Sequence, residues 1–201
     1  MKIRRTRQFM TLTDAMNKKL SMLMLLSNLI CTLFYSISYP YIYAETIKAV
    51  PHLYIGLEQI FACLGTIIFC KLWNTYSDKL FEHYRLFLII EVIADTILFA
   101  DVLIRGDLKF YFLLNIIIYS IITKNLSCGG IKMRAMVNPS EKERELYDNN
   151  SNIVDAIATL CGASAAIFFH FDLQLLFIFA LVGNSMDNIF YLYIYHKIKT
   201  R

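Results

Sequence analysis

Charged residues are scarce in this chain, and those present are clustered. Asp, Glu, Lys and Arg make up 18% of the 201 residues, whereas 57% of the residues are hydrophobic. Soluble domains carry about 25% charged residues, so this chain lacks the polar surface needed to remain in water. Its uncharged stretches are long enough to cross a bilayer core of about 30 Å, which takes about 20 helical residues. The composition argues against a soluble enzyme and predicts a multi-span protein embedded in the lipid bilayer.

The sequence also lacks the motifs of catalysis and of metal binding. It contains no H-E-x-x-H or G-x-S-x-G motif, and its five cysteines show no C-x-x-C spacing. These cysteines lie in or beside apolar stretches, where a free cysteine packs as a small apolar side chain. We therefore expect no enzyme activity, no metal site, no cofactor and no nucleic-acid partner.

Six apolar stretches are predicted to form transmembrane helices. Their apolar runs are unbroken, whereas a lipid-facing barrel strand would alternate apolar and polar residues. The predicted spans cover residues 20–44, 53–72, 86–104, 110–136, 153–171 and 173–195. A basic segment, 1–19, precedes this membrane domain of residues 20–197, and a short tail, 198–201, follows it. The expected fold is an all-α bundle of six transmembrane helices.

Lysine and arginine are distributed unequally between the two ends of this predicted bundle. Only Lys48, Arg105 and Lys109 belong to one end, whereas sixteen basic residues lie at the other end, in 1–19, 71–85, 132–144 and 197–201. Because cytoplasmic segments are enriched in these residues, both termini are predicted to be cytoplasmic. We expect a multi-pass protein of the cell membrane, such as the cytoplasmic membrane of a bacterium.

Two local patterns flank the start of the fifth predicted span. Asn138, Pro139 and Glu141 form a capping-box pattern, which predicts a short surface helix before the span. Small residues follow within the span at a spacing of four, which lets helix backbones approach closely. We expect these small residues to form a helix-packing face: Ala158, Gly162 and Ala166.

Lys124 lies near the midpoint of the predicted span 110–136, where a cation costs about 2.5–3.5 kcal/mol. Asp95 lies at the midpoint of the preceding span, and Glu91 lies one helical turn away from it. We therefore expect Lys124 and Asp95 to form an ion pair or to share a polar network with Glu91. The alternative is that the pair only holds two neighbouring helices together.

Acidic residues outnumber this one basic residue in the membrane interior. Glu58 and Asp187 also lie within about a turn of the midpoints of their predicted spans, in addition to Glu91 and Asp95. One lysine cannot neutralise four carboxyls, so we expect at least one of them to be protonated at neutral pH. Reversible protonation of a buried carboxyl is the chemistry of a proton-coupled transporter.

The segment between the second and third predicted spans resembles a known loop signature. It reads Asn-Thr-Tyr-Ser-Asp-Lys-Leu-Phe-Glu-His-Tyr-Arg from Asn74 to Arg85. Asp78 and Lys79 match the acidic and basic positions of the loop motif of the major facilitator superfamily, and Arg85 resembles a closing base. The two glycines of that motif are replaced by Asn74 and Phe81.

Two further stretches resemble the same superfamily. In the fourth span Lys124 is followed by glycines about a turn later, and residues 136–166 combine a proline, a charged stretch and a helix rich in small residues. Members of the superfamily have two parallel six-span halves, with the substrate site between them. The resemblance therefore implies half of such a transporter, which would pair with a second copy of itself or with another half-transporter.

This resemblance also implies where the functional residues lie. It places the first and fourth spans at the centre, so we expect Asn28, Tyr35, Tyr39 and Asn115 to line a cavity with Lys124. It further implies that Asp78 approaches the start of the fifth span, Ser151–Ile153, in a second copy, where a helix N-terminus would favour an anion.

Two functions of different classes follow. The first is a half-size major-facilitator-type transporter of a small solute, working as a homodimer, with proton coupling as one option. The second is a non-transporting membrane protein of the same fold: an immunity, regulatory or assembly partner, or a truncated transporter.

Overall fold

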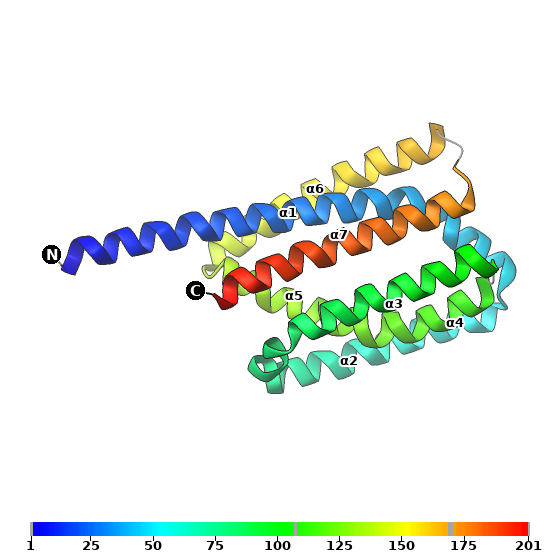
Figure 1. The fold of residues 1–201 in the computed structure, drawn as a ribbon, viewed down its shortest axis with the longest axis horizontal. Helices are drawn as coiled ribbons and strands as arrows, with labels where there is room; N and C mark the ends of the chain where they lie inside the picture. Colours follow the sequence, from blue (N-terminus) through cyan, green and yellow to red (C-terminus); the bar gives the residue numbers. More distant parts are fainter. Residues whose placement is uncertain (1, 107, 169–170, 201) are drawn as a thin grey trace.

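The computed structural model describes residues 2–106, 108–168 and 171–200, and all regular structure in them is helical. The helices run the length of the bundle in alternating directions, and both termini lie at the same end (Figure 1). The elements are α1 (Lys2–Ala49), α2 (His52–Glu82), α3 (Tyr84–Arg105), α4 (Leu108–Ile118), the π-helix η1 (Tyr119–Thr123), α5 (Lys124–Val137), α6 (Glu141–Phe168) and α7 (Leu173–Lys199).

Five helical stretches are long and apolar enough to cross a membrane. They are Thr13–Ala49, Leu53–Glu82, Tyr111–Val137, Glu141–Phe168 and Leu173–Lys199, the third of which joins α4, η1 and α5. The protein is therefore an all-α, multi-span membrane protein. The remaining predicted span, 86–104, forms α3, which does not meet the same criterion because it carries Glu91, Asp95 and Asp101.

Helix ends differ from the sequence-based expectation at two places. The loop expected at 73–85 is largely helical, because α2 continues to Glu82 through a kink at Tyr76 (φ −125°, ψ 28°). The capping box lies two residues later than predicted: the Ser140 N–H donates to Glu143 Oε2 (3.0 Å), and the Glu143 N–H donates to Ser140 Oγ (3.2 Å). The Asn138 N–H instead donates to the Arg134 carbonyl at the end of α5.

The helix that follows this box is also longer than predicted. A separate surface helix was expected before a span at 153–171, but α6 is continuous from Glu141 to Phe168. Residues 169 and 170 of that predicted span lie outside the described residues.

Helix α1 packs against both α6 and α7, while α2 packs against η1 and α5, and α3 against α7. The small residues Ala158, Gly162 and Ala166 are buried, and the helix they face is α1. A Cβ at Gly162 would lie 2.8 Å from the Leu33 carbonyl oxygen, so this glycine permits the close approach of the two backbones.

The buried apolar side chains form two main clusters towards opposite ends of the bundle. One cluster contains Trp73, Tyr84 and Ile194, and the other contains Leu98, Tyr111 and Phe177. Glu91 and Asp95 lie between these two clusters along α3. The polar side chains near the middle of the helices are therefore enclosed by apolar packing on both sides.

Candidate functional site

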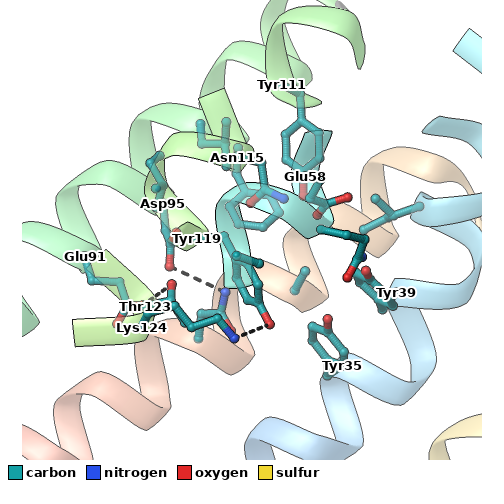
Figure 2. Close-up of a pocket in the computed structure, with 18 of the residues that line it drawn as sticks. Tyr35, Tyr39, Glu58, Glu91, Asp95, Tyr111, Asn115, Tyr119, Thr123 and Lys124 are labelled. Carbon is teal, nitrogen blue, oxygen red and sulfur yellow. Dashed lines mark hydrogen bonds between the residues drawn. The ribbon is translucent and has the colours of Figure 1, made fainter. Parts of the chain in front are cut away.

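A cavity of about 570 Å³ lies in this middle region, between α1, α2, α3, the α4–η1–α5 stretch and α7. Figure 2 shows side chains from these elements converging on it. It brings together seven of the residues that the sequence predicted for a transport site: Tyr35, Tyr39, Glu58, Glu91, Asp95, Asn115 and Lys124. Residues at similar depth on neighbouring helices meet because each helix rises by a constant 1.5 Å per residue.

Lys124 does not form the expected ion pair with Asp95. Its Nζ lies 3.3 Å from Tyr119 Oη and 4.5 Å from the centre of the Tyr119 ring. The reason lies in η1, which immediately precedes Lys124: a π-turn holds an extra residue and so rotates the residues after it about the helix axis. Thr123 faces the acidic residues in place of Lys124, and its hydroxyl donates to Glu91 (2.9 Å).

The three carboxyls of the cavity have no basic partner among the described residues. Glu91 accepts hydrogen bonds from Thr123 and Asn188, and Asp95 accepts one from the Asn184 amide (3.4 Å). Only neutral donors therefore compensate these two carboxyls.

Glu58 is less well satisfied than either of the other two carboxyls. It is 7% exposed, and its Oε2 is a buried atom without a hydrogen-bond partner. A buried carboxylate oxygen of this kind is costly unless a proton or a cation compensates it.

Tyrosine rings line the part of the cavity around Glu58. Tyr39 and Tyr111 line the cavity together with this carboxyl. The Tyr35 and Tyr39 rings are stacked with their centres 4.5 Å apart, and Tyr43 continues the stack at 5.6 Å from Tyr39. Sequence reasoning missed Tyr111 and Tyr119, because tyrosines are common in this chain and nothing in their spacing separates cavity residues from packing residues.

Asp187 lies in a second cavity, of about 350 Å³, on the side of the first one towards the chain termini. Its carboxyl accepts a hydrogen bond from Ser27 (2.5 Å). Glu91, Thr123 and Asn184 line both cavities, so the two are neighbours separated by these polar side chains. The second cavity also reaches Arg134, near the end of α5.

Asn28 does not line the main cavity, contrary to expectation. Its amide donates to Ser151 Oγ (2.8 Å) and to Asp155 Oδ1 (3.1 Å), and Thr32 Oγ1 also donates to Asp155 (3.0 Å). These bonds join α1 to α6, so Asn28 belongs to a helix interface. Asp155 was missed from the sequence, although an acidic residue inside a predicted span could have indicated it.

Asp78, the acidic residue of the loop motif, has a partner within its own chain. Lys132 Nζ lies 2.6 Å from Asp78 Oδ1 and donates to Ser77 Oγ at the same distance. This ammonium lowers the pKa of the Asp78 carboxyl, which is fully exposed beyond the predicted span, below its ordinary value. Lys79 and Arg85 are exposed.

The basis of the intermolecular contact expected for Asp78 is also missing. Because α6 begins at Glu141, residues 151–153 lie well inside the helix, where the backbone N–H groups are already bonded. Ser151 is moreover buried and bonded to Asn28. A helix N-terminus at Ser151–Ile153 is therefore not available to Asp78 of another copy.

Comparison of the chain with protein-family models, with curated proteins and with solved structures found no match. The class that composition and fold establish is a multi-span, all-helical membrane protein with an acidic cavity inside its helical bundle.

Proposed function

We propose that this protein is a membrane transporter that moves a small solute through the central cavity in exchange for protons. The observation that carries this proposal is the placement of Glu58, Glu91 and Asp95 around one cavity, where none of them forms an ion pair with a described residue. Ionisable residues inside a membrane domain typically mark a pathway for a substrate or an ion. A cavity of about 570 Å³ is large enough for a small organic molecule.

Proton exchange follows from the chemistry of these carboxyls. In the empty cavity a proton removes the cost of a buried charge, whereas a bound solute that compensates the charge makes the proton unnecessary. Solute and proton then compete for the same group. A protein that opens its cavity to each side of the membrane in turn would thereby couple the two movements.

A half-size, major-facilitator-type assembly is part of this proposal. In that arrangement two copies form a homodimer, and each copy contains the cavity of about 570 Å³. The Asp78–Lys132 ion pair within one chain means that the dimer does not depend on the loop aspartate. Its contact surface would instead involve apolar helix faces.

The test uses the full chain, reconstituted in proteoliposomes that contain a pH-sensitive dye. Added solutes are screened for those that move protons across the membrane, and an active solute is then tested on variants. Glu58→Gln and Asp95→Asn should abolish solute-driven proton movement, whereas Glu145→Gln, which alters an exposed carboxyl outside the cavity, should leave it unchanged. Proton movement that persists in both cavity variants would refute the proposal.

One observation favours the non-transporting alternative. Phe81 stands where the superfamily motif has a glycine, and its ring is 4% exposed, stacked on Tyr84 and packed against Tyr195. This packing ties the α2–α3 connection to the core of its own chain, so the connection is built differently from the glycine-containing loop of the superfamily. An immunity, regulatory or assembly partner, or a truncated transporter, would not need that loop.

A further inference from the structure

Charged side chains occupy two parts of the main cavity. Lys124 and Tyr119 lie in one part with Glu91 and Asp95, and Glu58 lies in the other part with Tyr39 and Tyr111 (Figure 2). We infer that the part around Glu58 binds a monovalent organic cation, such as a substituted ammonium or phosphonium group. This inference rests on the proposed function, which it extends by naming the chemical class of the solute.

The Glu58 carboxyl is uncompensated. Its Oε2 is buried without a hydrogen-bond donor among the described residues, and the Glu58 side chain lines a cavity with room for a ligand. Lys124, which also lines this cavity, is held by the Tyr119 hydroxyl and ring. Glu58 therefore has no basic partner in the part of the chain that the structure describes, and a positively charged ligand would supply one.

The side chains around Glu58 indicate the kind of cation. Aromatic rings attract a cation over their faces, and they favour large, weakly hydrated organic cations over small, strongly hydrated ions. Tyr39 and Tyr111 line the cavity beside Glu58 (Figure 2), and the Tyr35 ring, which is stacked on Tyr39, extends the aromatic wall. A hard metal ion would instead need several oxygen ligands around the same point. Rings beside a single carboxyl thus match an organic cation better than a metal ion.

The cavity as a whole carries more negative than positive side chains. Lys124 lines it, but so do Glu91 and Asp95, neither of which forms an ion pair with Lys124 in the described residues. One lysine does not cancel three carboxyls, so the cavity favours a cation over an anion. Asn115 and Thr123 also line the cavity and offer neutral polar contacts.

The test measures binding rather than transport, on the purified full chain in detergent. Two ions of nearly the same shape serve as probes: the cation tetraphenylphosphonium and the anion tetraphenylborate. We expect saturable binding of the cation, seen by equilibrium dialysis, and no displacement by an equal concentration of the anion. Equal binding of both ions would overturn the inference without any need for a variant.

Variants then locate the site. Glu58→Gln keeps the shape of the side chain and should weaken binding of tetraphenylphosphonium by at least about tenfold, as expected for loss of a charged partner. Tyr39→Leu should weaken it by about three- to tenfold, because one aromatic face is lost. Glu145→Gln is the matched control and should bind as the unmodified protein does. Unchanged binding in Glu58→Gln would refute the assignment.

Lowering the pH should also weaken binding in the unmodified protein, since protons compete with the cation for Glu58, and this dependence should be smaller in Glu58→Gln. The binding assay separates the two proposals. If tetraphenylphosphonium binds through Glu58 but moves no protons in proteoliposomes, the cation site stands and the transport function fails. If proton-coupled transport of another solute is found while the cation does not bind, the inference fails and the function stands.

Discussion

Gly65 on α2 provides the sharpest test of how the cavity walls are held. A Cβ at this position would overlap the backbone carbonyl of Ser120 in η1. A backbone group cannot rotate away as a side chain can, so Gly65→Ala would push α2 away from η1. Glu58 lies on α2 and Tyr119 lies on η1, and the cavity that both residues line would change shape. Overpacking of this kind costs about 1–3 kcal/mol.

Gly56 on the same helix is a matched control. A Cβ there would meet no atom within 4 Å. Replacing glycine by alanine in a helix otherwise stabilises it by up to about 1 kcal/mol, and this gain applies to both positions. We therefore expect Gly56→Ala to be neutral or stabilising, and Gly65→Ala to lower the free energy of unfolding by about 1–3 kcal/mol relative to Gly56→Ala.

The chain supplies its own probe for this comparison. Trp73 is the one tryptophan of the sequence, and its indole N–H donates to Asn125 Oδ1 (2.8 Å) across the α2–α5 contact. Its fluorescence should therefore follow loss of this contact as the protein unfolds in increasing amounts of denaturing detergent. Equal unfolding midpoints for the two variants would refute the close packing of α2 against η1.

Three further predictions test other parts of the structure. Cys70 and Cys128, whose sulfur atoms are 3.8 Å apart, should form an intramolecular disulfide under mild oxidation, detected by mass spectrometry and absent in Cys128→Ser. Asn28→Ala and Asp155→Ala should not be additive in unfolding experiments, with a coupling of about 0.5–1.5 kcal/mol, as found for hydrogen bonds between membrane helices; additivity would contradict the Asn28–Asp155 contact. Lys132→Met should raise the pKa of Asp78 towards about 3.9, its ordinary value, because the ammonium that lowers this pKa is removed. The pKa can be followed by NMR titration of the Asp78 carboxyl carbon. An unchanged pKa in Lys132→Met would contradict the ion pair.

The direction of the pKa shift of Asp78 determines how its contribution to stability depends on pH. Because the pKa of this carboxyl is lower in the folded protein, its contribution to stability is present above the pKa of the unfolded chain. That contribution is lost as the pH falls through the lower pKa of the folded state. Lys132→Met should therefore remove a pH dependence of the free energy of unfolding that is confined to acidic solution.

The common level of these ionisable residues along the bundle could be predicted from the sequence, but the direction in which each side chain points could not. Glu58, Asp95 and Lys124 were placed near the middle of their spans, and they line one cavity because helical rise fixes depth. The side on which Lys124 lies depends on the π-helix just before it. A sequence pattern based on 3.6 residues per turn contains no signal for that extra residue, so the ion pair with Asp95 was wrongly expected.

The length of α6 shows a second limit. Polar residues at 147–152 suggested that the span starts at 153, but the helix extends back to the Ser140–Glu143 capping box. Ser151 and Asp155 bond to Asn28 on α1, and this tertiary contact compensates their polarity. Hydropathy alone cannot reveal a partner on another helix. Asn28 was assigned to the cavity because the family resemblance placed the first span at the centre.

Access to the cavity from both sides of the membrane is the property that separates a transporter from a non-transporting protein of the same fold. This access can be measured by thiol labelling in proteoliposomes. The variant carries a single cysteine, Asn115→Cys, in a chain whose own cysteines are replaced. A membrane-impermeant thiol reagent is then added to one side of the membrane at a time. Asn115 lines the cavity. We expect labelling from either side and protection by tetraphenylphosphonium, whereas labelling from one side alone, at every pH tested, would contradict transport through this cavity.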